Sequence, residues 1–297
     1  MAQHPGRTAT PSLAALAVGV AALAIFAAER WSPLRRRTQA EPARTVRNLV
    51  LGALSMAAVA AVESPVALPL ARRAASQRRG LVQRLPLPAW ARDGLAFLGM
   101  DYTIYLWHVL THKVPALWRL HLVHHLDLDL DASTALRFHA VDMLVSTPYR
   151  AAQVALLGAS PRAFRAWRRF FFLSILFHHS NLRLPPRLER LLACVLTTPR
   201  MHGIHHSAVH NETESNWSSG LSLWDHLHGT FRLDVPQSAI RIGVPAYRDP
   251  AEIRLRPSLK LPFVHQRDAW RPENPASMTR LRRWRVIRDI LRPIPAC

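Results

Sequence analysis

The most constraining feature of this sequence is a run of 21 residues without a charged side chain, Thr8–Ala28, which ends at Glu29 and Arg30. It is rich in Ala, Leu and Val, and a helix of this length crosses the hydrocarbon core of a bilayer. A cleaved signal peptide is the alternative, but only Arg7 precedes the run as a basic residue, and the run is longer than the apolar part of most signals. The sequence therefore predicts at least one membrane-spanning helix.

Further apolar runs allow more spans. The segment Asn48–Ala71 carries only Glu63 as a charge and contains Pro65 and Pro69, so it could either span the bilayer or enter it and bend. Three shorter apolar runs follow at Gly94–Leu106, Met143–Leu157 and Phe170–Phe177. We expect one to four spanning helices, which favours an integral membrane protein.

The charge of the chain is strongly positive, with 39 basic against 19 acidic residues and a formal net charge of +20. Such a charge suits either nucleic acid or an anionic membrane surface. Here the basic residues flank the apolar runs and are not interleaved with aromatic residues, so no nucleic-acid partner is expected. Arginines lie on both sides of Asn48–Ala71, which contradicts a simple positive-inside topology. This run is then a re-entrant hairpin, or one basic loop lies on the outer side.

The C-terminal segment alternates arginines with apolar residues. Trp284, Ile287 and Leu291 would share one face of a helix, which predicts a cationic amphipathic helix lying on anionic head groups. An ordinary packed helix is an equal alternative. We divide the chain into a membrane-spanning or hairpin region with basic loops at 1–92, a catalytic domain at 93–249 and a basic tail at 250–297. Two cysteines, Cys194 and Cys297, are too few for a disulfide framework.

Histidines carry most of the chemical information, since 14 of the 16 lie between His108 and His228. They are grouped as H-x-x-x-H at His108 and His112, and as H-x-x-H-H at His121, His124 and His125 and again at His202, His205 and His206. On a helix, residues i, i+3 and i+4 lie on one face, so each group can point several imidazoles at one place. Imidazole binds Fe, Zn and Cu, and so many unligated imidazoles would leave buried polar nitrogens unsatisfied.

The number of histidines indicates two metal ions. One tetrahedral zinc needs about three or four protein ligands, whereas about eight to ten are enough for two ions of higher coordination number. Soluble di-iron bundles use Glu-x-x-His, and zinc proteases of the zincin type use H-E-x-x-H, and neither motif occurs here.

The order of the histidine motifs resembles the fatty acid hydroxylase/sterol desaturase superfamily of membrane di-iron enzymes. The resemblance covers about Gly94–Asp249 and rests on ordered blocks: D-Y-T-I-Y-L-W-H-V-L-T-H from Asp101, L-W-R-L-H-L-V-H-H from Leu117, T-A-L-R-F-H-A-V-D from Thr134, F-H-H-S-N-L-R-L-P from Phe177, T-P-R-M-H-G-I-H-H-S from Thr198, and N-W-S-S-G-L-S-L-W-D-H-L-H-G-T-F from Asn216. It implies an all-α fold of polytopic membrane helices with a cytosolic histidine-lined helical cap that holds a dinuclear metal site.

The resemblance also implies which residues form the site. The implied catalytic metal ligands are His108, His112, His121, His124, His125, His179, His202, His205 and His206. His139 matches the R-F-H block and is a further ligand or a neighbour of one, whereas His178 occupies a non-ligand position. The candidates for hydrogen-bonding to the ligands are Asp101, Asp142, Asn181, Asn216 and Asp225. The block pattern departs from the family at Val109, Ala140 and His228, and none of these departures removes a ligand.

The implied activity is hydroxylation or desaturation of a fatty acyl, sterol or isoprenoid lipid by two irons and dioxygen, with zinc possible in an inactive form. No haem or flavin motif is visible, so electrons would come from a ferredoxin or a cytochrome b5-type reductase chain. The enzyme is expected in a bacterial inner membrane with its site facing the cytoplasm. The alternatives are a zinc hydrolase and a non-catalytic metal-binding or scaffold protein on the same membrane scaffold.

Overall fold

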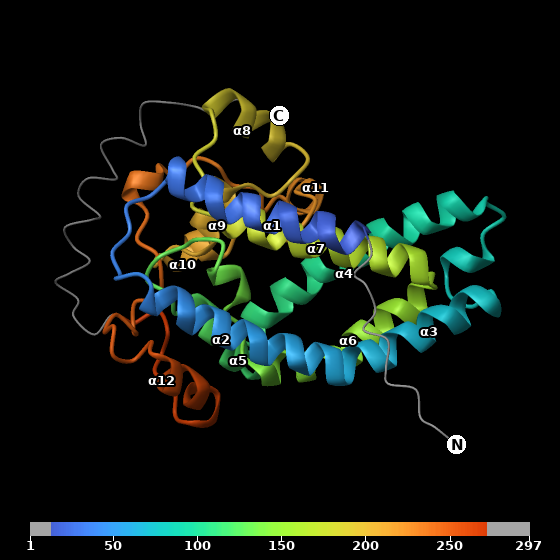
Figure 1. Cartoon of the computed structure of the whole chain (residues 1–297), viewed down its shortest axis with the longest axis horizontal. Helices are drawn as coiled ribbons and strands as arrows, with labels where there is room; N and C mark the ends of the chain where they lie inside the picture. Colours follow the sequence, from blue (N-terminus) through green and yellow to red (C-terminus); the bar gives the residue numbers. More distant parts are fainter. Residues whose placement is uncertain (1–12, 272–297) are drawn as a thin grey trace, which may run out of the picture.

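The computed structural model describes residues 13–271, and helices dominate this part of the chain (Figure 1). The helices are α1 (Leu13–Trp31), α2 (Ala43–Ala58), α3 (Ser64–Ser76), α4 (Ala89–Lys113), α5 (Pro115–His125), α6 (Ala140–Leu157), α7 (Pro161–His179), α8 (Pro186–Ala193), α9 (Pro199–His205), α10 (His210–Thr213), α11 (Leu223–His228) and α12 (Leu255–Lys260). Within 13–271 the chain forms three isolated β-bridges and no named strand. The predicted all-α class is confirmed.

Two helices among the described residues are long and apolar enough to cross a membrane. The first is α1, which continues through Glu29 and Arg30, three residues beyond the predicted apolar run. Its apolar side chains are largely exposed, including Leu13 and Leu23. A helix this apolar and this exposed needs a nonpolar surrounding, so the protein is a membrane protein by this criterion.

The second long helix decides between the two alternatives for Asn48–Ala71, a spanning helix or a bend at the prolines. Ala43–Ser76 is one helical rod of 34 residues, in which α2 continues through a π-helical segment, Val59–Glu63, into α3. Proline lacks an N–H and its ring clashes with the carbonyl four residues earlier. For Pro65 that carbonyl belongs to Ala61, inside the π-helical segment, where the wider turn relieves the clash. The run therefore does not form a re-entrant hairpin.

The three shorter apolar runs lie in α4, α6 and α7, which pack against one another and against the two long helices. Helix α4 contacts α7, and α6 contacts α2 and α3. None of these three helices meets the length and hydropathy expected of a spanning helix. The number of candidate spanning helices within residues 13–271 is therefore two, inside the predicted range of one to four.

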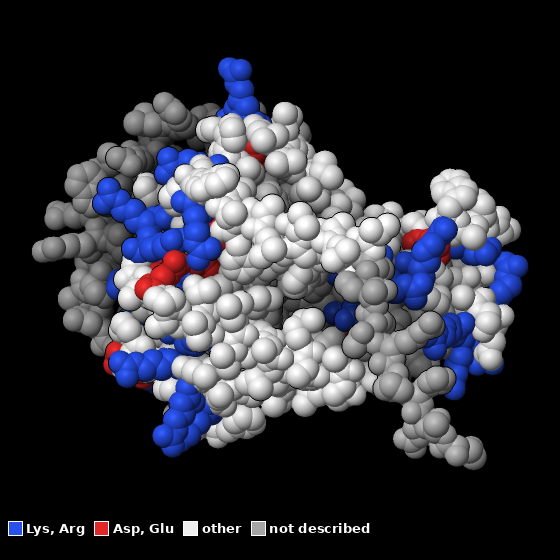
Figure 2. Space-filling view, viewed as in Figure 1, with Lys and Arg blue, Asp and Glu red and all other residues white. Residues whose placement is uncertain are grey.

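The surface separates into two basic ends and an uncharged band. Helices α1 and α2 run across the molecule in Figure 1, and Figure 2 shows lysines and arginines gathered at both ends with uncharged residues between them. This pattern matches the positions of the basic loops at 32–42 and 77–88. We call the surface of α1 and α2 between these ends the uncharged band.

A buried ionic network fastens the loop after α5 to the start of α2. Arg44 pairs with Asp127 at 2.9 Å and also with Asp131, and all three side chains are almost completely buried. Burial alone would raise the pKa of Asp127, yet Arg44 and Arg137 hold that pKa well below its usual range, so the carboxylate stays charged. The loop that follows His125, the last residue of α5, is thereby fixed to the long helix.

Residues 255–263 pack beside α5, where Arg119 donates to the carbonyl oxygens of Pro262 and Val264. The predicted amphipathic helix around Trp284 lies outside the described residues. The three-part division of the chain stays a prediction.

Candidate metal centre

Four helices bring the grouped histidines to one end of the molecule. His108 and His112 lie on the last turns of α4, and His179 is the last residue of α7. One H-x-x-H-H motif ends α5, and the other begins in α9 at His202 and ends at His206, the residue directly after that helix. Each motif is helical, as its i, i+3, i+4 spacing predicts, so its imidazoles leave one face of a short helix.

One group of imidazoles consists of His108, His112, His125 and His205. Each offers one ring nitrogen, and these four nitrogens lie within 4.8 Å of one another. Three of the four residues are buried and His112 is partly buried. Residues from α4, α5 and α9 thus form the first candidate metal position.

The second group consists of His124, His179, His202 and His206, all buried. The Nε2 atom of His179 lies 3.0 Å from Nε2 of His124 and 3.0 Å from Nε2 of His202, and His206 Nε2 lies 3.1 Å from His202 Nε2. Adjacent ligands about 2.1 Å from an octahedral ion are roughly 3 Å apart, so these separations suit a shared ion. His121 groups with His124 and His125, between the two positions.

Backbone carbonyls orient three of these rings. His108 donates from Nδ1 to the carbonyl oxygen of Trp217 at 2.7 Å, and His205 donates from Nδ1 to that of Ser215 at 2.9 Å. His179 donates to the carbonyl oxygen of Ile175 at 2.7 Å. A neutral ring with its proton on Nδ1 has its lone pair on Nε2, which is the form that binds a metal.

The chemistry of the remaining nitrogens also fits metal ions. Several buried ring nitrogens have no hydrogen-bond partner: His112 Nε2, both nitrogens of His121, His124 Nδ1, His125 Nε2, His202 Nδ1 and His205 Nε2. Burial lowers the pKa of His124, His125, His202 and His206 well below the usual value and that of His205 to about 3. These rings are neutral at pH 7, so they can act as ligands without first losing a proton.

His139 is the one implied ligand that the structure keeps apart from both groups. It caps the start of α6, where its Nδ1 accepts from the backbone N–H of Val141 at 3.1 Å. Its Nε2 lies 3.2 Å from the carbonyl oxygen of Leu259. Both ring nitrogens therefore have protein partners, which leaves no lone pair for a metal, and the ligand reading of His139 is not supported.

The three acidic candidates have different surroundings. Asp142 Oδ2 lies 3.7 Å from Nδ1 of His121, so it is placed to act on a ligand. Asp101 instead accepts from Leu221 N–H and the Trp224 indole, and it contacts no histidine in these bonds. Asp225 accepts from the N–H groups of Trp217 and Ser218 at 2.8 and 3.0 Å. It reaches His108 only indirectly, by holding the residue whose carbonyl that ring contacts.

The side chains of Asn181 and Asn216 were expected to orient imidazoles, and neither of them does so. Asn181 bonds to the backbone of Arg35, which ties the loop after α1 to the end of α7. Asn216 bonds to the carbonyl oxygens of Met201 and Arg232 and to the N–H of Arg232. Its backbone φ is +54°, a left-handed conformation that Asn tolerates better than most residues.

Sequence reasoning missed the backbone carbonyls and the position of His178 in the cavity wall. The carbonyls belong to Ser215 and Trp217, on either side of Asn216, and no side-chain pattern could have identified them. His178 is buried, both of its ring nitrogens lack a partner, and its ring lies 4.1 Å from that of His202, centroid to centroid. It belongs to neither group of four, but it lines the cavity beside them.

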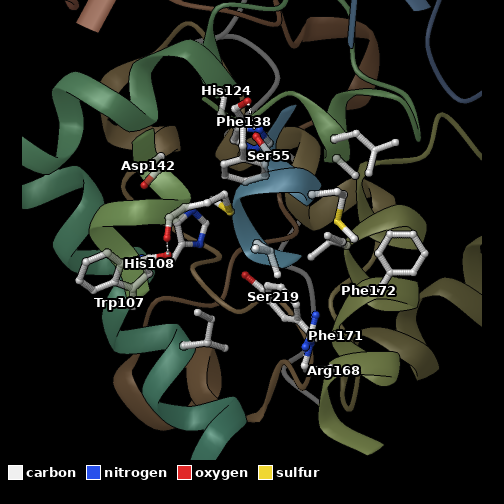
Figure 3. A pocket seen from close by; sticks show the side chains of 18 of the residues that line it. Ser55, Trp107, His108, His124, Phe138, Asp142, Arg168, Phe171, Phe172 and Ser219 are labelled. Carbon is white, nitrogen blue, oxygen red and sulfur yellow. Dashed lines mark hydrogen bonds between the residues drawn. The ribbon is translucent and has the colours of Figure 1, made fainter. Parts of the chain in front are cut away.

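A cavity of about 470 Å³ extends from the histidines into the helix bundle. Val18 of α1, Ser55 and Met56 of α2 and Val59 of the π-helical segment line it, and Figure 2 shows a hollow in the uncharged band between α1 and α2. In Figure 3, His108, His124 and Asp142 lie on one side of the cavity and Arg168 lies across it. Aromatic residues such as Phe138, Phe171 and Phe172 make much of its wall apolar.

Converging histidines beside an apolar, lipid-sized cavity define a class of helical membrane proteins with a histidine-rich metal site. Residues 94–230 match the fatty acid hydroxylase family. This match confirms the resemblance to the family that the order of the histidine blocks indicated.

Among known proteins, the chain is similar to an ornithine lipid hydroxylase of Rhizobium tropici, with 28% identity over 76% of this chain and 68% of that protein. It is also similar to human alkylglycerol monooxygenase, with 28% identity over 47% of this chain, and to rat cholesterol 25-hydroxylase, with 27% identity over 46%. The alignments cover 30% of the human protein and 46% of the rat protein. No solved structure matches the chain. The named relatives are hydroxylases or monooxygenases, so an oxidoreductase acting on lipid is supported.

Proposed function

We propose that this protein is a membrane-bound di-iron oxygenase that hydroxylates or desaturates a lipid. The observation that carries the proposal is the convergence of two groups of four histidines at one end of an apolar cavity. Iron bound there would supply the activation of dioxygen needed to oxidise an unactivated C–H bond. Hydroxylation consumes the lipid, dioxygen, two electrons and two protons and releases the alcohol and water.

The residues of the chain hold, orient and shield this chemistry. The first group would hold one ion and the second group the other, with His121 between them. Trp217 and Ser215 fix the rings of His108 and His205, and Asp142 offsets the positive charge near His121. Phe138 stacks on His124 with ring centroids 4.2 Å apart and so covers one face of that ring with an apolar side chain.

The electrons would come from a separate donor, a ferredoxin or a cytochrome b5-type reductase chain. The basic loop after α1 lies at the histidine end of the molecule and carries Arg36 and Arg37, so it suits an acidic donor. We expect the protein in a bacterial inner membrane with this end facing the cytoplasm.

The test combines metal content with oxygen consumption. Purified protein should hold close to two metal ions, with iron in the active form, and should consume dioxygen only with lipid and reductant. His124→Ala and His205→Ala each remove a ligand from one group and should lose metal and turnover together. Variants with unchanged metal content would show that the ligand assignment is wrong.

The same experiment separates the alternatives. A zinc hydrolase would hold zinc and release hydrolysis products without oxygen uptake. A metal-binding or scaffold protein would hold metal and give no lipid product. A comparison of the lipids of a strain with and without the gene would identify the oxidised species.

A further inference from the structure

The chemical character of the cavity wall changes along α7. Arg168, Phe171, Phe172, Ile175 and His179 all line it, at spacings of i, i+3, i+4, i+7 and i+11. Eleven residues make about three helical turns, so the arginine and the histidine lie on one face about 16 Å apart along the axis. The wall contributed by α7 is therefore cationic at one end, apolar in the middle and metal-binding at the other end.

The cavity wall contributed by α6 shows the same change from its histidine end to a cationic end. On α6, Asp142 lies beside His121 and Arg150 lies two turns further along, and both line the cavity. Arg150 Nε lies 3.8 Å from Glu63 at the end of the π-helical segment, and Arg168 donates to Ser64 Oγ at 3.1 Å. Arginines from α6 and α7 thus meet at the same place, which we call the arginine end.

The charges at the arginine end do not balance. Among the described residues, four arginines line the cavity there: Arg150 is buried with 7% of its surface exposed, Arg168 is partly buried, and Arg165 and Arg169 are exposed. Within residues 13–271, Glu63 is the one acidic residue that lines this end, because the other lining acid, Asp142, lies beside His121. Ionisable groups within a membrane helix bundle are costly and usually face a partner or a substrate path, so an anion is expected among these arginines.

We propose that the arginine end binds the acidic head group, a carboxylate or a phosphate, of the lipid that the histidine end oxidises. The guanidinium of Arg168 would pair with the head group, and the chain would lie along Phe171, Phe172 and Ile175 toward His179. This inference rests on the proposed function and adds the class of substrate. It also means that the distance between the two ends selects which carbon is oxidised.

The test measures binding, so that it does not depend on turnover. The full chain in an uncharged maltoside detergent is titrated with palmitic acid, with hexadecyl phosphate and with methyl palmitate, which lacks the charge. Wild type should bind the better acid about tenfold or more tightly than the ester, as expected for a charge-assisted hydrogen bond. Arg168→Gln should remove this difference without changing the affinity for the ester, and Arg168→Lys should restore part of it.

Arg162→Gln is the matched control. Arg162 lies on the same end of α7 and is exposed, but it pairs with Asp93 and does not line the cavity. This variant should bind like wild type, and equal metal content in all variants would show that they are folded. Equal binding of acids and ester by wild type, or an unchanged preference in Arg168→Gln, would overturn the proposal.

The two proposals fail in different ways. Oxidation of lipid by a protein that binds acid and ester equally would refute the head-group site and leave the oxygenase intact. A strong preference for the acid in a protein that takes up no dioxygen with any lipid would refute the oxygenase, and with it the role of this site in substrate selection.

Discussion

At the scale of single residues, Asn216 links two of the proposed metal ligands without touching either. The carbonyls on its two sides, from Ser215 and Trp217, accept from His205 and His108, which belong to the same group of four. The left-handed backbone of Asn216 aims both carbonyls at that group, and its side chain is held by Met201 and Arg232. Asn216 is therefore a positioning residue.

Replacing Asn216 should weaken metal binding. Asn216→Gly keeps the left-handed backbone accessible but loses the side-chain hydrogen bonds, and Asn216→Ala also strains the backbone. We expect about 10- to 100-fold weaker metal affinity, the range for lost outer contacts of a ligand, with the alanine variant worse. Competition with a chelator measures this affinity. Wild-type affinity in both variants would mean that the carbonyls need no such support.

The adjacent histidines at the end of α7 should differ in function. His179 Nε2 lies 3.0 Å from both His124 and His202, whereas His178 belongs to no group of four. His179→Ala should lose iron and oxygenase activity. His178→Ala should keep its iron and lose at most several-fold in turnover, through altered contact with substrate. An inactive His178 variant beside an active His179 variant would show that the block is assigned one residue out of phase.

At the scale of elements, the buried network at the start of α2 should determine stability. Arg44→Ala leaves Asp127 and Asp131 buried without their cation, which typically costs about 3–5 kcal/mol. Arg37→Ala is the control, because the pair of Arg37 with Glu41 is more exposed and should contribute less than about 1 kcal/mol. Unfolding of both variants in detergent measures the difference. Similar losses would show that the network does not hold α2 to the loop after α5.

The geometry of α7 predicts the position of oxidation. If the arginine end holds the head group, lipids with the same acidic head and different chain lengths should be oxidised at the same number of carbons from the head. Mass spectrometry of the products locates the new oxygen or double bond. A position that is instead constant from the methyl end would place the anchor at the far end of the chain.

The sequence predicted the helices that carry the histidines because i, i+3, i+4 spacing has one simple geometric reading. It left open whether Asn48–Ala71 spans as one rod or bends, because a π-helical segment can accommodate Pro65 in a way that no local pattern reveals. The roles of Asn181 and Asn216 were missed because a polar side chain next to a ligand in sequence can bond to distant backbone. His139 has the right type and motif, but it caps a helix instead.

At the scale of the whole molecule, the uncharged band predicts that purification of the protein requires detergent. Helices α1 and α2 carry many exposed apolar side chains, such as Leu16, Val20 and Leu54, which water solvates poorly. The chain should therefore leave membranes only with detergent. Recovery in the soluble fraction after a carbonate wash would contradict the membrane assignment.

The hollow between α1 and α2 determines how the concentration of substrate should be counted. A lipid that enters there comes from the plane of the bilayer, so the enzyme responds to the mole fraction of that lipid and not to its amount per volume of solution. Diluting the substrate with inert phospholipid at constant total substrate should therefore slow turnover, whereas diluting the vesicles with buffer should not. In a cell, the rate would then follow the lipid composition of the membrane around each molecule.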